Sequence, residues 1–191
     1  PTLQLIDLSG RTEDQYVGAQ GWFIPIQNLV QFVAPDYLGN PSTLNYYGIF
    51  NYGEFVGYVG IGGLLFALSA LFYRRDRKVI FYSVIFALSI IFALQNAISM
   101  VPFQLKIPFI SSAQPTRLLV LSCFSLSVLA ALGFDYFLKK KKILFPILLV
   151  GVVILVLWVI ALFFPSLYPA AQDMLVSRNN LKLPTILYIV F

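Results

Sequence analysis

Residues 143–164 read ILFPILLVGVVILVLWVIALFF, a run of 22 residues with no charged side chain. A helix needs about 20 mostly apolar residues to cross a hydrocarbon core roughly 30 Å thick. A run that is apolar on all sides also excludes an amphipathic helix of a soluble protein, because such a helix keeps one polar face. We therefore predict that residues 143–164 cross a membrane.

Three further segments without charged residues precede this run, at 55–73, 79–100 and 118–134. We predict membrane spans over about 55–73, 79–100, 118–138 and 143–164. Residues 183–191 have the composition of a fifth span that is cut short, and the first residue is Pro rather than Met, so we interpret the chain as an internal segment of a longer protein. The predicted fold class is an all-α polytopic bundle of transmembrane helices, over residues 55–191, with interfacial helices in the outer loops.

The composition restricts the chemistry that the chain can perform. Hydrophobic residues make up 59% of the chain and charged residues 11%, whereas soluble domains carry about 25% charged residues. There is no His and a single Cys, Cys123, which excludes Ser/His/Asp triads, His/Cys zinc sites and an internal disulfide. We predict no metal site and no cofactor within these residues, and we interpret Cys123 as a small apolar filler within its span.

The distribution of Lys and Arg predicts the orientation of the spans. Four basic residues lie in the turn 74–78 and four in 139–142, together eight of the 13 in the chain. Short cytoplasmic loops retain positive charge, so we predict that both turns are cytoplasmic and that residues 1–54 form an extracytoplasmic loop. The net charge of +5 is then a signal of topology and of contact with membrane lipids, not of nucleic-acid binding.

Residues 22–35 read WFIPIQNLVQFVAP and are too few to cross a membrane. Four apolar residues recur at i, i+3, i+4 and i+7, which predicts a short amphipathic helix lying at the membrane interface. The apolar side would carry Ile26, Leu29, Val30 and Val33, and the opposite side Gln27, Asn28 and Gln31. The loops that follow at 35–54 and 101–115 are rich in Pro and Tyr or in Pro and apolar residues, which indicates ordered segments close to the membrane.

Arg117 is the first candidate for a functional residue. It opens the third predicted span at its outer end and follows the polar residues Gln114 and Thr116. One interpretation is an interfacial anchor whose stem lies in the membrane and whose charge reaches the water. The other is a clamp for a lipid phosphate, because the planar guanidinium matches the spacing of phosphate oxygens. The sequence leaves both interpretations open.

Other candidates lie on the same predicted face. Glu54 begins the first span and is either a solvated residue at a helix start or a carboxylate that orients a sugar hydroxyl. Asp36 is either a turn residue or a sugar contact, and Gln114 joins Arg117 as a candidate for substrate binding. We interpret Gln95 and Asn96 as residues that bond to neighbouring helices, and the glycines at 53–63, two of which form a GxxxG spacing, as sites of close helix packing.

Three motifs resemble the YfhO-type family of bacterial membrane proteins. Residues 114–117 read QPTR and precede an apolar span that ends in LAALGFD, similar to the family's Arg, apolar span and LAGxG pattern. Residues 53–61 read GEFVGYVGI, similar to its Glu followed by a Tyr-Val-Gly helix. Residues 34–39 read APDYLG, which resembles its PxxxG element after an interfacial helix. Together these motifs cover most of residues 22–140.

The resemblance implies a relative of the GT-C glycosyltransferases, which take a sugar from a polyprenyl-phosphate carrier and pass it to a cell-envelope glycan or polymer at the outer face of the bacterial cytoplasmic membrane. It implies Arg117 as the contact to the carrier phosphate, Glu54 as a carboxylate lining the site, and a main catalytic carboxylate outside this chain. Two alternatives stay open, a transporter or flippase of lipid-linked sugars and a membrane subunit without catalysis. A transporter would be expected to carry ionisable residues deep in its spans, and the complete predicted spans have none.

Overall fold

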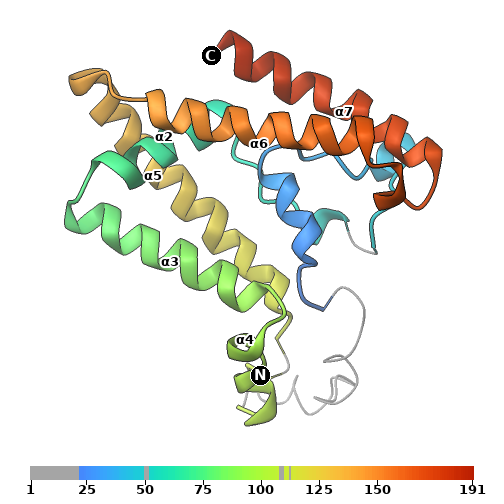
Figure 1. Ribbon diagram of the computed structural model, residues 1–191. Helices are drawn as coiled ribbons and strands as arrows, with labels where there is room; N and C mark the ends of the chain where they lie inside the picture. The colour runs from blue at the N-terminus through green and yellow to red at the C-terminus, as the bar shows by residue number, and fades with distance from the viewer. Residues whose placement is uncertain (1–21, 50–51, 108–109, 112) are drawn as a thin grey trace.

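The computed structural model describes residues 22–49, 52–107, 110–111 and 113–191, and every regular element in this part of the chain is helical, as predicted (Figure 1). Five short elements are 3₁₀ helices and six are α-helices. The 3₁₀ helices are η1 (Ile26–Phe32), η2 (Pro41–Thr43), η3 (Tyr52–Glu54), η4 (Pro115–Leu118) and η5 (Pro165–Leu167). The α-helices are α2 (Ile61–Tyr73), α3 (Arg77–Ala93), α4 (Ala97–Gln104), α5 (Leu119–Lys140), α6 (Leu144–Phe163) and α7 (Ala171–Val190). Residues 1–21 of the predicted outer loop lie outside the described residues.

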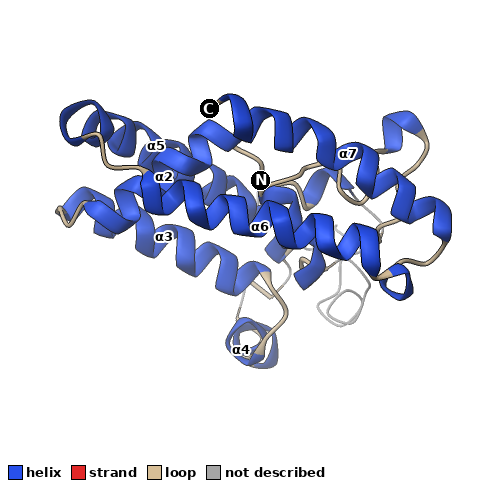
Figure 2. Cartoon of the chain, turned by 45° about the horizontal axis from the view of Figure 1, so that its top comes forward, coloured by secondary structure: helices blue, strands red, loops and turns tan. Residues whose placement is uncertain are grey.

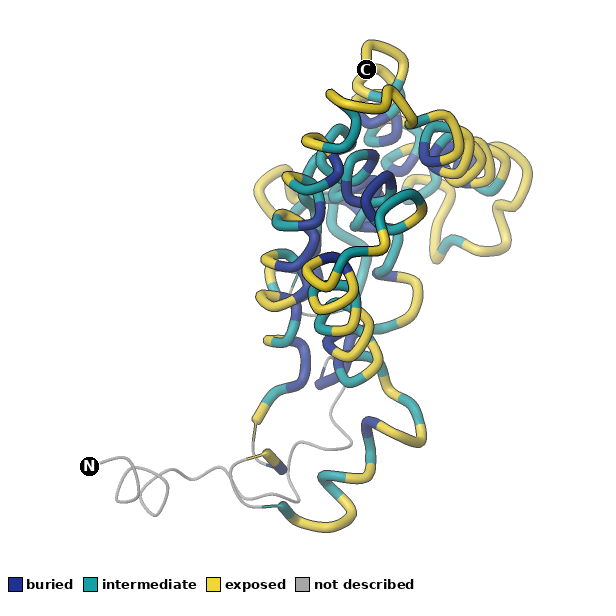
Figure 3. The backbone as a smooth tube through the Cα atoms, turned by 90° about the vertical axis from the view of Figure 1, so that its left-hand side faces the viewer, coloured by how far each residue is buried: buried dark blue, intermediate teal, exposed yellow. Residues whose placement is uncertain are grey.

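Within the part of the chain that the structure describes, two helices are long and apolar enough to cross a membrane. They are the continuous segment Pro115–Lys140, which joins η4 to α5, and α6. Residues on the outward side of α6, such as Leu148 and Leu155, are more than half exposed, and exposed positions run along the outside of the bundle (Figure 3). Apolar surface of this extent indicates association with a membrane, because soluble proteins cover such surface.

Helices α2 and α3 are shorter than the predicted spans 55–73 and 79–100, so four complete spans are not confirmed. Gly60 has φ +83°, a left-handed conformation that interrupts a right-handed helix, and α2 begins only after it. Helix α3 stops at Ala93, and Asn96 then caps α4 by accepting from the backbone N–H groups of Ile98 and Ser99. Asn96 therefore ends one helix and starts another, whereas we expected it to bond to a neighbouring helix.

Helix α7 begins twelve residues before the predicted fifth span at 183, so its polar first half is helical. Arg178 donates to the carbonyl oxygens of Ala161 and Leu162. These oxygens lie at the end of α6 and have no partner within that helix. Asn180 donates to the carbonyl oxygen of Asp36 at 2.5 Å. Helices α6 and α7 lie side by side and antiparallel (Figure 2). Because its polar groups bind backbone oxygens, this half of α7 packs against α6 and residues 36–37, with Ser177 and Leu181 buried on the packed side and the other side exposed.

The predicted short helix is present at residues 26–32 as a 3₁₀ helix, and its buried side differs in part from the side that the α-helical spacing predicts. Residues 26–32 form a 3₁₀ helix, which has 3.0 residues per turn, so its buried side falls on every third residue. Asn28, Gln31 and Ala34 are at most 1% exposed, whereas Ile26 is 68% exposed. Asn28 and Gln31 of the predicted polar side are thus buried, whereas Gln27 is exposed and Val33 is buried, as predicted.

Helices α2 and α5 cross in close contact at Gly133. A Cβ atom added to Gly133 would overlap the carbonyl oxygen of Phe66 on α2. Around this crossing, Ala67, Ala70 and Leu129 are fully buried. The GxxxG pair predicted from the sequence, Gly53 and Gly57, lies outside the α-helices and does not form a helix crossing, so the close packing depends on a glycine that the sequence analysis did not select.

The two basic turns lie at one end of the bundle, as predicted. Arg74 in the first turn donates to the carbonyl oxygen of Leu132 at 2.8 Å and to Asp135 at 3.3 Å near the end of α5. Asp135 also forms an ion pair with Lys139, one turn further along α5, at 2.9 Å. We name this end, with turns 74–78 and 139–142, the basic end, and the opposite end, where α2 begins and α3 stops, the pocket end.

Replacing Gly133 should destabilise the bundle. We expect Gly133→Ala to lower the free energy of unfolding by about 1–3 kcal/mol, because the added methyl meets backbone that only separation of α2 and α5 can move. Thermal unfolding in detergent, followed by circular dichroism at 222 nm, measures the change. The matched control is Gly63→Ala, since a Cβ there meets only the Val59 side chain at 3.7 Å. An equal midpoint for both variants would contradict the close crossing.

Candidate functional site

A pocket of about 590 Å³ lies at the pocket end, between η3 and the start of α5. Glu54 comes from η3, and Thr116 and Arg117 come from η4, so residues 62 or more positions apart in the sequence meet there. Phe55, which follows Glu54, is fully buried with Ile24, Ala93 and Leu119. The buried Phe55 side chain anchors η3 against the first turn of α5. This contact places two of the predicted site residues, Glu54 and Arg117, in one pocket.

Glu54 is held by a hydrogen bond from the opposite wall. The Thr116 hydroxyl donates to the Glu54 carboxylate oxygen Oε2 at 2.8 Å. Thr116 is 1% exposed and follows Pro115, whose fixed φ suits the first position of η4. Glu54 itself is only half-buried, so its side chain is fixed through Oε2 and still partly exposed.

Arg117 is exposed and unpaired. Within the described part of the chain, its guanidinium makes no hydrogen bond and no ion pair, and its backbone N–H donates to the carbonyl oxygen of Gln114 at 3.2 Å. Glu54 lines the same pocket but does not neutralise this charge. An unpaired guanidinium beside apolar walls favours binding of an anion from outside the chain.

Gln114 and Asp36 do not line this pocket. Gln114 contributes the backbone carbonyl that supports Arg117. Asp36 instead accepts from the Tyr52 hydroxyl at 2.5 Å and from the Asn40 amide at 2.9 Å, an arrangement that stabilises the turn after residue 35. Burial raises the pKa of Tyr52, so its hydroxyl stays protonated and donates to Asp36 at neutral pH. Asp36 therefore supports the site through η3, and its contact to a sugar stays a prediction.

Two lining residues were not selected from the sequence. Thr116 was noted only as a polar neighbour of Arg117, and Cys123 was interpreted as a filler, although it is half-buried and lines the pocket. Thr116, Val120 and Cys123 follow a spacing of i, i+4 and i+7, which places them on one side of the helix. This spacing can be read from the sequence. It shows that the three residues lie on the same side of the helix, but it does not show that this side faces a pocket.

The pocket combines one carboxylate, one unpaired guanidinium and apolar surface. The guanidinium can bind an anionic group, and the carboxylate can orient a hydroxyl. Both charged groups lie close to the apolar outer side of α5. Among the described residues there is no group of three or more His, Cys, Asp or Glu side chains that could hold a metal ion.

No family model matches the chain, and neither a curated protein nor a solved structure matches it. The resemblance to YfhO-type proteins stays a prediction, and the function is argued below from the pocket.

The thiol of Cys123 should report the charge in the pocket. We expect Arg117→Gln to slow its reaction with an anionic methanethiosulfonate, relative to a cationic one, by about threefold or more, because one unpaired positive charge is lost. Glu54→Gln should change this rate ratio in the opposite direction. The control is Lys182→Gln, which removes an exposed charge on α7. The same ratio in all four proteins would show that the two charges do not act at this pocket.

Proposed function

We propose that the chain is the membrane core of a GT-C-like glycosyltransferase, related to the YfhO-type family, which moves a sugar from a polyprenyl-phosphate carrier to a cell-envelope acceptor at the outer face of the bacterial cytoplasmic membrane. The observation that carries the proposal is the unpaired guanidinium of Arg117 in one pocket with the half-buried carboxylate of Glu54. A carrier of this class has the matching groups, a phosphate, sugar hydroxyls and an apolar chain.

In the proposed reaction, Arg117 binds oxygens of the carrier phosphate. The bond between the sugar and the phosphate oxygen breaks, and negative charge grows on the departing phosphate, where a fixed guanidinium stabilises it. Glu54, held by Thr116, accepts a hydrogen bond from a sugar hydroxyl and so orients the ring. The base for the acceptor hydroxyl is the carboxylate that the family resemblance places outside this chain.

The outer side of α5 provides a surface for the carrier chain. Val120 lines the pocket and is 71% exposed, and Phe124, one turn further along α5, is 57% exposed. These residues lead from the charged pocket along the bundle in the direction of the basic end. A polyprenyl chain would lie against this side of α5 while its phosphate reaches Arg117.

In the proposed membrane arrangement, the pocket end faces outward and the basic end faces the cytoplasm. Helices α2 and α3 are completed by short non-helical segments, such as residues 55–60, and residues 183–191, at the end of α7, begin the fifth crossing. Non-helical backbone at membrane depth is tolerated where it is buried in protein or lines a cavity. Phe55 is fully buried, and the carbonyl oxygen of Ala93 accepts from the backbone N–H of Ile24 at 2.9 Å, which supports this placement.

Labelling of single cysteines tests the orientation. In a Cys123→Ala background, Leu44→Cys should react with a membrane-impermeant maleimide added outside intact cells, whereas Arg75→Cys should react only after the membrane is opened. Leu44 is 94% exposed and Arg75 is also exposed, so both positions are accessible to the reagent. The reverse pattern would place the Arg117 pocket in the cytoplasm and overturn transfer at the outer face.

Replacing Arg117 tests the carrier-phosphate role. In cells that express the full-length protein, we expect Arg117→Ala to abolish the added cell-envelope glycan and Arg117→Lys to retain part of it, because an ammonium keeps the charge but loses the bidentate geometry. Membrane fractions probed with lectins and by mass spectrometry measure the glycan. The control Lys182→Ala should leave the glycan unchanged, and all variants should insert equally.

A second measurement separates binding from chemistry. Polyprenyl phosphate should protect Cys123 from methanethiosulfonates in the parent protein, and this protection should be lost in Arg117→Ala. If Arg117→Ala leaves the glycan unchanged, Arg117 does not bind the carrier phosphate and is an interfacial anchor.

A transporter or flippase of lipid-linked sugars is the second candidate. The interruption between α3 and α4 at residues 94–96 favours it, because many transporters bind substrate where a membrane helix is broken. The glycan experiment distinguishes the two functions. A transferase forms a new sugar bond to the acceptor, whereas a transporter delivers lipid-linked sugar to the outer leaflet without forming that bond.

A further inference from the structure

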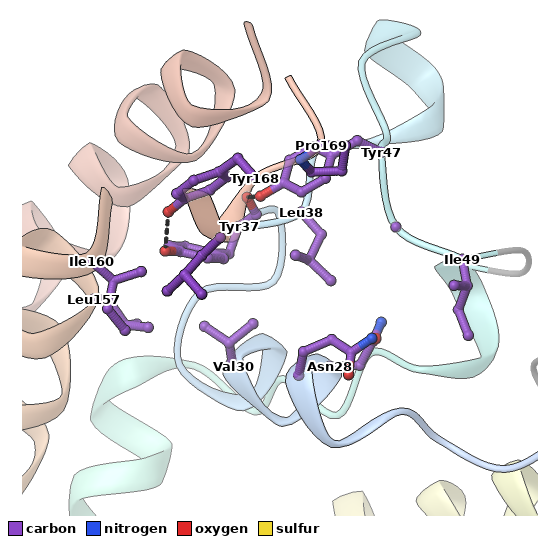
Figure 4. A pocket seen from close by; sticks show the side chains of 13 residues that line it. Asn28, Val30, Tyr37, Leu38, Tyr47, Ile49, Leu157, Ile160, Tyr168 and Pro169 are labelled. Carbon is purple, nitrogen blue, oxygen red and sulfur yellow. Dashed lines mark hydrogen bonds between the residues drawn. The ribbon is translucent and has the colours of Figure 1, made fainter. Parts of the chain in front are cut away.

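The cavities at the two ends of the bundle differ in charge. At the pocket end, a cavity of about 520 Å³ lies between residues 27–49 and the end of α6, and none of the described residues that line it is charged (Figure 4). At the basic end, a pocket of about 330 Å³ lies between the turn 74–78 and the end of α5. Five of the seven described residues that line this second pocket are charged, so its charge indicates which ligand it can bind.

Both carboxylates in the pocket at the basic end are already paired. The guanidinium of Arg74 forms ion pairs with Asp76 at 2.5 Å and with Asp135 at 3.3 Å. Lys139 forms a second ion pair with Asp135, at 2.9 Å. Arg74 also donates to the carbonyl oxygen of Leu132 at 2.8 Å, which fixes its side chain against α5. Arg74 and Lys139 together therefore offset the two negative charges.

Arg75 is the cation that remains. It lines the pocket and is exposed, and its side chain forms no ion pair and no hydrogen bond within the described part of the chain. Three cations and two carboxylates leave the pocket with one positive charge. The other basic residues of the two turns, at 77–78 and 140–142, add to this potential without a further acid. The pocket therefore suits a group with a single negative charge, such as a phosphodiester.

Exposed apolar side chains lie next to the pocket on three helices. Phe72 on α2 precedes the lining residue Tyr73 and is 41% exposed, and Leu138 on α5 precedes Lys139 and is 54% exposed. Ile80 on α3, just after the turn 74–78, is also 54% exposed. A dissolved polyanion would leave this apolar surface in water, whereas a phospholipid covers it with its acyl chains. The apolar surroundings therefore favour a lipid as the source of the phosphodiester.

Two tyrosines form the rest of the lining. The rings of Tyr73 and Tyr136 stack with 6.2 Å between their centroids and an interplanar angle of 14°. The Tyr73 hydroxyl accepts from the backbone N–H of Phe145 at 3.3 Å, which connects this wall to the start of α6. Tyrosines are enriched at the level of lipid head groups, because the ring is apolar and the hydroxyl is polar. The pair is thus consistent with a pocket at the boundary between membrane and water.

We propose that this pocket binds the head group of an anionic phospholipid of the phosphatidylglycerol type, from the leaflet at the basic end, and that Arg75 pairs with its phosphate. Arg74 is a positioning residue, because it offsets two carboxylates that would otherwise repel the phosphate. Phosphatidylcholine binds less well, since its own cation enters a pocket that is already positive. The proposal uses neither Arg117 nor Glu54, so its failure leaves the proposed glycosyltransferase function untouched.

Photoreactive lipids test the proposal in the purified protein in phosphatidylcholine nanodiscs. The parent protein carries Arg117→Gln, so that the guanidinium at the pocket end does not contribute. Two probes have the same acyl chains with a diazirine near the head group, and one is a phosphatidylglycerol and the other a phosphatidylcholine. We expect the first to label residues 73–78 and 135–142 about fivefold more than the second, because one basic residue near the surface attracts an anionic lipid by about this factor. Mass spectrometry of chymotryptic peptides locates the label.

Two variants that remove the same charge separate the pocket from the general attraction of the basic end. Arg75→Gln should reduce the labelling ratio to about one, and Arg75→Lys should retain part of it. The matched control is Arg77→Gln, since Arg77 is also exposed but does not line the pocket, and it should change the ratio less than twofold. Thermal unfolding should be the same for all of them, because Arg75 has no side-chain partner among the described residues.

A rescue experiment tests the role of Arg74. Arg74→Gln should lower the labelling ratio, because the carboxylates of Asp76 and Asp135 then lose a counter-charge. Adding Asp135→Asn removes one of these negative charges and should restore the ratio. A purely structural role of Arg74 would predict no such rescue.

Three results would overturn the proposal. Equal labelling of the parent protein by the two probes would show that the pocket does not select an anion. An equal loss of the ratio in Arg75→Gln and Arg77→Gln would assign the attraction to the whole basic end. Loss of the label on addition of free glycerol 3-phosphate or of hexaglutamate would assign the pocket to a soluble phosphate or to an acidic peptide.

Discussion

Helices α2 and α3 stop short at the pocket end, and the backbone there needs hydrogen-bond partners from outside a helix. Ile24 supplies one through its bond to the carbonyl oxygen of Ala93, and Asn96 supplies others by capping α4. Residues 22–49 in turn present carbonyl oxygens that α7 satisfies, through Ser177 to Tyr37 and Asn180 to Asp36. The structure of the pocket end depends on this exchange, because an unpaired peptide group in an apolar environment costs several kcal/mol.

The same exchange leaves room at the pocket end for the pocket with Glu54 and Arg117. At the basic end, the helices are held close by Arg74 and by the Ser69 hydroxyl, which donates to the carbonyl oxygen of Lys142. At the pocket end, 3₁₀ helices and extended segments separate the α-helices, and such segments fill space less regularly than helices in direct contact. Polar side chains can lie between them, since the freed backbone groups provide partners.

The sequence predicted the parts of the fold that depend on composition. Helix α5 and helix α6 begin and end within about two residues of their predicted limits, because their apolar runs are bounded by charged residues or, at the end of α6, by Pro165. The limits of α2, α3 and α7 were wrong because they depend on contacts. Gly60 needs its left-handed conformation, Asn96 can be helical or a cap, and the polar half of α7 is stable only where residues 36–47 and the end of α6 accept its hydrogen bonds.

The candidate site was predictable to a similar degree. Glu54 and Arg117 could be selected because each charged residue lies at the limit of an apolar span on the predicted outer face, although the sequence left open whether they only start a span or bind a ligand. Their position in one pocket follows from the burial of Phe55 between Ile24 and Leu119, a contact between distant segments that no local pattern contains. Asn28 was misplaced for a different reason. The prediction used the α-helical period of 3.6 residues, whereas a 3₁₀ helix turns every three residues and brings Asn28 and Gln31 to the same, buried side.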